Sequence, residues 1–188
     1  MIPGNLYHIF NRGNNSERIF FSRENYLFFL GKTRRHLLFH LDLLAYCLMP
    51  NHFHLMVSTK DTFDRSSFSK DLRIMLSSYT RAINEQNNRT GSLFQQNTKI
   101  KSLEEGGNSL DYPITCFHYI HQNPVKAKLV KRFEEWEMSS FNEYMGRSKD
   151  PICNIDLARQ YLEIPERSDL FMVQAYDVQI IMDFSLEE

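Results

Sequence analysis

The order of hydrophobic and polar positions along the chain predicts short strands alternating with longer helices. Strands are expected where apolar residues form runs bounded by turn residues, at residues 6–10, 40–48, 52–57 and 93–103. Helices are expected at residues 22–38, 67–87 and 111–123. Ser22 and Asp111 are suitable N-caps, Pro113 suits a first helical turn, and Pro124 is expected to end the third helix.

The resulting order, strand-helix-strand-strand-helix-strand-helix, is typical of an α+β domain. It predicts an antiparallel sheet with helices packed on one face. After Met145 the pattern weakens. Residues 156–162 suit a short helix, and residues 177–184 suit a strand or a helix equally well.

Charge divides the chain into two unlike parts. Residues 150–188 carry nine acidic and two basic side chains, whereas residues 1–149 carry 20 basic and 14 acidic ones. A moderately basic body is compatible with a nucleic-acid partner, although a solvated mixed-charge surface is the commoner explanation. We therefore divide the chain into a domain at residues 1–148 and an acidic C-terminal extension of unknown role at residues 149–188.

Neither a membrane span nor an export signal is expected. No stretch approaches the roughly 20 apolar residues of a membrane-spanning helix, and the N-terminus lacks the layout of a signal peptide. Cys47, Cys116 and Cys153 are widely spaced and odd in number, which fits reduced thiols rather than a disulfide framework. We therefore expect a cytoplasmic protein with no membrane partner.

His52-Phe53-His54 is the first candidate for chemistry. Side chains alternate between the faces of a strand, so the two imidazoles share one face while Phe53 enters the core from the other. Their Cα atoms then lie ~6.6 Å apart, which allows both rings to reach one cation. A solvent-facing strand that carries two histidines is the alternative explanation.

A second candidate lies on the third predicted helix. Tyr119 and Asn123 are four residues apart and so project from nearly the same face. Packing of the phenol and helix capping by the amide are the ordinary roles for such residues. If this helix packs across the sheet, however, Tyr119 could serve as a nucleophile beside a cation held by His52 and His54. Asn123 would offer a third ligand, and the remaining open positions suit Mg²⁺ or Mn²⁺.

Four segments in the same order carry a resemblance to a known family. They are YHIFNRGN at residues 7–14, AYCLMPNHFHL at 45–55, YIHQNPV at 119–125 and SSFNEY at 139–144. The chain resembles the single-tyrosine HUH transposases over about residues 5–145. The most similar branch is the insertion-sequence-200-like family, which includes the REP-associated tyrosine transposases (RAYTs).

The resemblance implies a ferredoxin-like (RRM-like) sheet and a transposase that cuts and rejoins single-stranded DNA through a 5′-phosphotyrosine. It also implies recognition of hairpin, REP-like DNA beside the cleavage site. By position, His52 and His54 would be metal ligands and Tyr119 the nucleophile. The broader family suggests a possible homodimer, whereas this branch could act as a monomer.

Two departures from the family pattern affect the site. Relatives place a glutamine four residues after the nucleophile, where this chain has Asn123. Gln122 and His121 are rivals for the third ligand, although His121 lies about 200° around the helix from Tyr119. Gln96-Asn97 replaces the Gly-Arg pair that many relatives have after their Leu-Phe-Gln element.

Basic residues near these motifs are candidate DNA contacts. They are Lys126, Lys128, Lys131 and Arg132 after the nucleophile, Lys99 with Lys101 on the fourth strand, and Arg12 and Asn14 at the first turn. Such side chains could follow phosphates into the site, although a solvated helix face and an ordinary turn are the alternatives. Two other functions stay open: a non-catalytic, domesticated nucleic-acid-binding protein, and a metal-dependent hydrolase that uses activated water.

Overall fold

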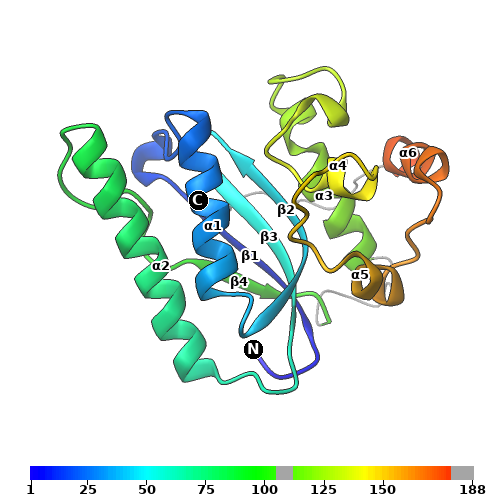
Figure 1. The fold of residues 1–188 in the computed structure, drawn as a ribbon, viewed down its shortest axis with the longest axis horizontal. Coiled ribbons are helices and arrows are strands. Elements are labelled where there is room, and N and C mark those ends of the chain that lie inside the picture. Colours follow the sequence, from blue (N-terminus) through cyan, green and yellow to red (C-terminus); the bar gives the residue numbers. More distant parts are fainter. Residues whose placement is uncertain (105–111, 179–188) are drawn as a thin grey trace.

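A computed structural model describes residues 1–104 and 112–178 of the chain. A four-stranded antiparallel sheet, with strand order β2-β3-β1-β4, lies at its centre (Figure 1). The strands are β1 (Leu6–Arg12), β2 (Leu41–Met49), β3 (His52–Thr59) and β4 (Lys99–Ser102). The α-helices are α1 (Arg23–His36), α2 (Arg65–Gln86), α3 (Tyr112–Lys126), α4 (Phe141–Tyr144), α5 (Ile155–Tyr161) and α6 (Ser168–Asp177). Short 3₁₀ turns are η1 (Asn14–Ser16) and η2 (Phe133–Glu135).

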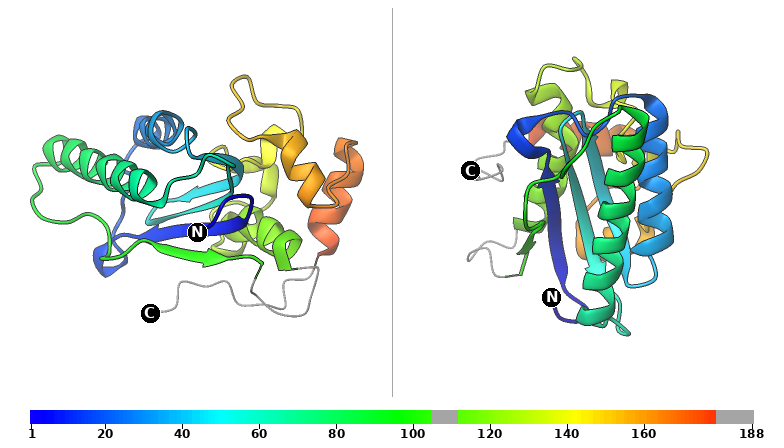
Figure 2. Two further views of the ribbon diagram at one scale, coloured as in Figure 1. Left: turned by 90° about the horizontal axis from the view of Figure 1, so that it is seen from below. Right: turned by 90° about the vertical axis from the view of Figure 1, so that its left-hand side faces the viewer.

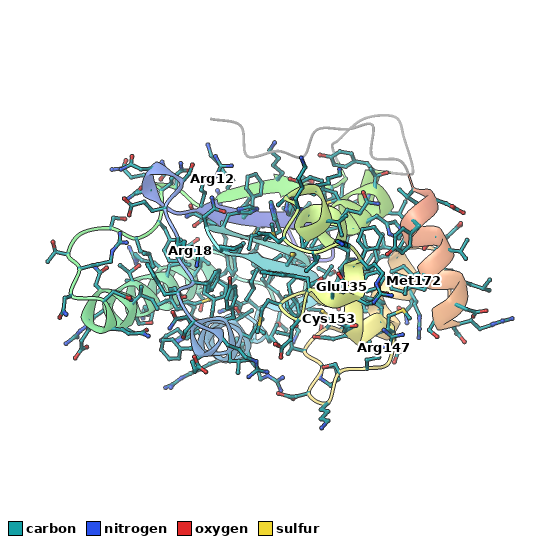
Figure 3. All side chains as sticks on the ribbon, turned by 90° about the horizontal axis from the view of Figure 1, so that it is seen from above. Arg12, Arg18, Glu135, Arg147, Cys153 and Met172 are labelled. Carbon is teal, nitrogen blue, oxygen red and sulfur yellow. The ribbon has the colours of Figure 1, made fainter. Side chains whose placement is uncertain are left out.

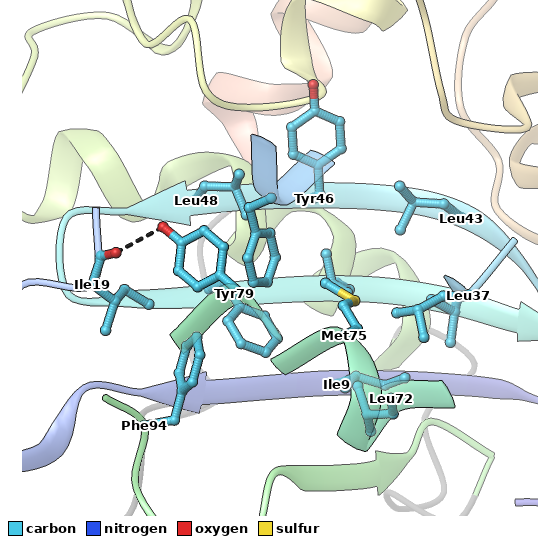
Figure 4. Close-up of a cluster of buried hydrophobic side chains, with 14 of the residues drawn as sticks. Ile9, Ile19, Leu37, Leu43, Tyr46, Leu48, Leu72, Met75, Tyr79 and Phe94 are labelled. Carbon is cyan, nitrogen blue, oxygen red and sulfur yellow. Dashed lines mark hydrogen bonds between the residues drawn. The ribbon is translucent and has the colours of Figure 1, made fainter. Parts of the chain in front are cut away.

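The order β1-α1-β2-β3-α2-β4 with this strand arrangement confirms the predicted α+β, ferredoxin-like class. Helices α1 and α2 pack on one face of the sheet through the odd-numbered residues of β1 and β3, such as Ile9 and Phe53. Figure 4 shows this cluster, in which the Tyr79 hydroxyl donates a hydrogen bond to the Ile19 carbonyl oxygen at 2.8 Å. The predicted helix start at Ser22 is confirmed as the N-cap of α1.

The opposite face is covered as well, which differs from the expectation of helices on one face only. Helix α3 lies there, and residues of α4, α5 and α6 belong to the same buried cluster (Figure 2). The reason lies in β2, whose residues from Leu43 to Met49 are all buried. A strand buried on both faces is a continuous apolar run rather than an alternating one. The continuous apolar run of β2 therefore indicates that helices cover both faces of the sheet, which the prediction of a strand does not by itself reveal.

The fourth strand is shorter than predicted. Strand β4 contains only Lys99–Ser102, whereas residues 93–98 form an irregular connection with an isolated bridge between Phe94 and Gly13. Asn97 has a φ of 62°, a left-handed conformation that interrupts an extended strand. The amide of Gln95 instead donates to the Arg12 carbonyl oxygen at 2.8 Å, which fastens this connection to the turn after β1.

The predicted end of the third helix at Asn123 is wrong, because α3 continues to Lys126 through Pro124. A proline inside a helix lacks an N–H donor and crowds the carbonyl group four residues earlier, but here the last turn is retained by later bonds. The Ala127 amide donates to the Asn123 carbonyl oxygen and the Leu129 amide to that of Pro124, both at 2.9 Å. The proposed cap Asp111 lies outside the described residues.

The C-terminal part contains one confirmed and one unpredicted helix. Helix α5 confirms the short helix expected at residues 156–162. Helix α6 was missed because its apolar side chains surround it: Phe171 is buried, whereas Leu170, Val173 and Tyr176 are exposed. Apart from Asp177 and Val178, the strand or helix considered at residues 177–184 lies outside the described residues. In the part of the chain that the structure describes, no helix is long and apolar enough to cross a membrane.

The turn after β1 depends on the absence of a side chain at Gly13. A Cβ atom there would lie 2.2 Å from the Glu17 carbonyl oxygen, closer than any real contact. We expect Gly13→Ala to lower the free energy of unfolding by about 1–3 kcal/mol, measured by urea denaturation. Gly31→Ala is the matched control. It lies in α1 with no atom within 4 Å of the added Cβ, so we expect it to stabilise the protein by about 0.5–1 kcal/mol. Equal effects at both positions would contradict the steric argument.

Candidate active site

Strand β3 presents His52 and His54 on the face covered by α3. In the sheet register His52 lies opposite Arg12 and His54 lies opposite Phe10, both on β1. The two imidazole centroids are 5.0 Å apart. His54 is fully buried and His52 is partly buried. The sequence spacing therefore brings the two rings together inside the protein rather than on a solvent-facing surface.

Both imidazoles are neutral, and each can offer the lone pair of its Nε2 atom. Burial, with the nearby Arg12 charge, lowers the pKa of His52 to about 4, and burial holds the pKa of His54 well below its usual value. The Nδ1 of His52 lies 2.7 Å from the Asn51 side-chain oxygen, an acceptor, so the ring carries its proton there and exposes Nε2 as a lone pair. The Nε2 of His54 is buried and has no hydrogen-bond partner among the described residues.

A third imidazole, that of His8 on β1, belongs to the same site. Its Nε2 lies 2.9 Å from Nδ1 of His54, and the ring centroids are 5.0 Å apart. Burial, aided by the charge of Lys101, lowers the pKa of His8 to about 3. Sequence reasoning missed His8 as a site residue. It lies two positions before Phe10 and four before Arg12 on β1, and so shares one face of the strand with them.

Helix α3 places Tyr119 against the histidine cluster. The phenol ring is 8% exposed, and its centroid lies 5.5 Å from that of His54 and 6.3 Å from that of His8. Lys126 lies about two helical turns after Tyr119 on α3. Its Nζ atom is 5.4 Å from the centroid of the Tyr119 ring. Two motifs 65 positions apart in the chain are thus joined at one place by the packing of α3 on the sheet.

The three candidates for a further ligand have different surroundings. Asn123 lies one turn beyond Tyr119, and its Nδ2 donates to the Tyr119 carbonyl oxygen at 2.9 Å. Gln122 is buried and donates to the carbonyl oxygens of Ala175 and Val178 in the C-terminal segment. His121 is also buried, and its Nε2 lies 2.7 Å from the Ser140 hydroxyl. Both rivals are therefore engaged in contacts with segments that follow α3.

These donors suit a divalent cation with several open positions. Among residues 1–104 and 112–178 there is no group of three or more His, Cys, Asp or Glu side chains arranged to hold a metal. Two neutral imidazoles can nevertheless supply part of a coordination shell, provided that an amide oxygen, a phosphate or water completes it. The buried, unpartnered Nε2 of His54 is the atom that such a cation would satisfy.

Some of the predicted DNA contacts lie beside this cluster. Arg12 projects from the end of β1 (Figure 3), and Lys99 lies opposite Phe10 on β4. Lys101, opposite His8, shares that face. Lys126 is close to Tyr119, as described above.

Other predicted contacts lie in a different setting. Lys128 and Lys131 are exposed beyond α3, and Arg132 is hydrogen-bonded to Glu135 at 2.9 Å. The Asn14 amide nitrogen donates to the Ser92 carbonyl oxygen at 3.0 Å. In the described ranges, no hydrogen bond or ion pair joins these four residues to His52 or His54.

Comparisons with known proteins show one family by sequence and a similar fold among solved structures. A family model described as "Transposase IS200 like" matches residues 6–123. Among solved structures, a REP-associated tyrosine transposase bound to a REP hairpin is similar, with a TM-score of 0.56 and 21% sequence identity. That match covers 81% of this chain and 85% of the other chain, and it shows a shared fold. A search of curated proteins found no match.

Proposed function

We propose that this chain, which belongs to the family of IS200-like transposases, cuts and rejoins single-stranded DNA with Tyr119 as the nucleophile. The observation that carries the proposal is the packing of the Tyr119 ring against His54, across α3 and β3, beside a buried Nε2 atom with no described partner. The REP hairpin bound by the structurally similar transposase supports hairpin DNA as the partner.

In the proposed reaction the Tyr119 oxygen attacks a backbone phosphorus atom. A new P–O bond forms to the tyrosine, and the bond from phosphorus to the 3′ oxygen of the preceding nucleotide breaks. The phenol loses its proton and the leaving oxygen gains one, so the products are a 5′-phosphotyrosine and a free 3′-hydroxyl. Attack by a 3′-hydroxyl reverses the step, which rejoins DNA without ATP. Mg²⁺ or Mn²⁺ bound by His52, His54 and Asn123 would polarise the phosphate and offset its developing charge.

A denaturing-gel assay tests the proposal. The substrate is labelled single-stranded hairpin DNA from the ends that flank this gene, incubated with Mn²⁺, with Mg²⁺ or with a chelator. We expect a covalent protein–DNA adduct that requires the metal. Metal-dependent cleavage that leaves no adduct would instead indicate hydrolysis by activated water. Binding without cleavage, on DNA verified to contain the ends, would indicate a domesticated DNA-binding protein.

The third ligand can be identified by Mn²⁺ titration. We expect Asn123→Ala to weaken Mn²⁺ binding by about tenfold or more, because its side-chain oxygen completes the donor set. Gln122→Ala should leave the Kd unchanged and instead lower the free energy of unfolding by about 1 kcal/mol, since it removes the bonds to Ala175 and Val178. The opposite pattern would assign the ligand to Gln122.

Phosphate contacts are tested by salt dependence. We expect Lys126→Gln to weaken hairpin binding and to reduce the slope of log Kd against log salt by about 0.7–0.9, the loss of one phosphate contact. Arg132→Gln is the comparison, because Glu134 and Glu135 already lie 3.6 and 2.9 Å from the Arg132 Nε. Its slope should change less. A larger change for Arg132 would place the DNA over η2 rather than over the end of α3.

A further inference from the structure

His8 and His54 form a hydrogen bond between two buried imidazoles, and the proposed reaction as described so far gives His8 no role. The His8 Nε2 and His54 Nδ1 atoms are 2.9 Å apart, and the two residues are 1% and 0% exposed. One ring must donate this bond and the other must accept it. Burial excludes water as a competing partner, so the direction of the bond determines which nitrogen of each ring carries the proton.

The other nitrogen of His54 decides that direction. Its Nε2 is buried without a hydrogen-bond partner in the part of the chain that the structure describes. A nitrogen that binds a metal must offer a lone pair and therefore carries no proton. The neutral ring then has its proton on Nδ1 and donates it to His8, which accepts through Nε2 and keeps its own proton on Nδ1.

The sheet also holds the two rings in place. His8 lies opposite Met56 in the register, so it is the diagonal neighbour of His54 on the same face. The two rings are nearly parallel, with an interplanar angle of 25°, whereas the Tyr119 ring meets His54 edge-on at 81°. Rotation of the His54 ring would break the bond to His8 and disturb the contact with Tyr119.

We propose that His8 is a positioning residue that keeps His54 in its Nδ1–H tautomer and directs Nε2 toward the divalent cation. This inference rests on the metal site of the proposed function. His52 obtains the same control from its neighbour in the chain, since its Nδ1 is bound to the Asn51 side chain at 2.7 Å. His54 obtains it from another strand, so its competence as a ligand depends on the pairing of β1 with β3.

The tautomer is measured directly by ¹⁵N NMR of the histidine rings in the metal-free protein. We expect His54 to show a protonated Nδ1 and an unprotonated Nε2 in the wild type. His8→Gln keeps a side-chain oxygen near the position of the imidazole Nε2 and should preserve this state, whereas His8→Leu should lose it. A wild-type His54 protonated on Nε2 would overturn the inference without reference to any metal.

Metal affinity is the second readout. We expect His8→Leu to weaken Mn²⁺ binding by about 10–100-fold, the usual effect of removing a partner of a metal ligand, and His8→Gln to restore it. His118→Leu is the matched control, because His118 is also fully buried but its ring faces Phe171 rather than His54. That variant should bind Mn²⁺ as the wild type does. A similar loss in His118→Leu would mean that any buried histidine matters only through stability, and would overturn the role of His8.

The two hypotheses fail in different ways. If the wild type binds no Mn²⁺, the metal site of the proposed function is wrong. If the wild type binds Mn²⁺ tightly and His8→Leu binds it equally well, the metal site stands and only the role of His8 is overturned.

Discussion

Tyr119→Phe is expected to reduce covalent adduct formation with hairpin DNA by about 10³-fold or more, since no other group can replace an attacking nucleophile. The phenylalanine ring keeps the contacts of the 8% exposed phenol with His54 and His8. Hairpin binding and the Mn²⁺ affinity should therefore remain close to those of the wild type. The measurement is the fraction of labelled DNA that migrates with denatured protein, compared with binding by gel shift under native conditions.

Tyr79→Phe separates loss of chemistry from loss of a buried hydroxyl. The Tyr79 hydroxyl donates to Ile19 in the core between α2 and the sheet, on the face opposite the candidate site. Its removal should cost about 0.5–1.5 kcal/mol of stability and leave adduct formation intact. An adduct that persists in Tyr119→Phe would show that another residue attacks the DNA, and would remove the basis of the proposed mechanism.

The histidine pair could be predicted because its geometry is local. Two residues separated by one position on a strand share a face wherever that strand lies in the fold. The prediction that His54 and Tyr119 lie at one site needed the family resemblance, because it depends on which face of the sheet α3 covers. His8 was missed for the same reason: its distance from His54 follows from the register of β1 against β3, and no spacing within one segment encodes that register.

One of the two errors in secondary structure also comes from contacts distant in sequence, whereas the other has a local cause. Residues 93–98 look like a strand, but backbone hydrogen bonds with Arg12 and Asn14 and an isolated bridge to Gly13 join them to the turn after β1, and the left-handed Asn97 interrupts the strand. Pro124 looks like a helix end, yet later amides complete the last turn of α3. At residues 93–98 the local preference is weak beside hydrogen bonds from a distant turn, and at Pro124 it is weak beside backbone bonds made by the residues that follow.

The choice of a third metal ligand among His121, Gln122 and Asn123 also depends on contacts that the sequence does not reveal. Helical geometry already disfavoured His121, but it did not separate Asn123 from Gln122. The structure engages Gln122 with carbonyl oxygens of the C-terminal segment, a part of the chain whose pattern predicted little. The sequence assigned no role to this acidic segment, and its described part contributes buried residues to the core around α3.

Phe171 is the centre of that contribution. Its ring is fully buried in α6 and lies 5.0 Å from Phe141 and 5.5 Å from Tyr144, measured between centroids. It also contacts Phe117 and His121 on α3, the helix that carries Tyr119. The position of the proposed nucleophile therefore depends on a helix outside the residues matched by the family model, which end at residue 123.

We expect Phe171→Ala to lower the free energy of unfolding by about 3–5 kcal/mol in urea denaturation, because it leaves a cavity between α6 and α3. Such a loss is a large part of the roughly 5–15 kcal/mol that stabilises a typical domain. Leu170→Ala, on the same helix but 47% exposed, should change stability by less than about 0.5 kcal/mol. At urea concentrations below its unfolding midpoint, Phe171→Ala should also form less covalent adduct than the wild type, because α3 loses the packing of Phe171. Unchanged stability would mean that α6 covers the core without anchoring α3.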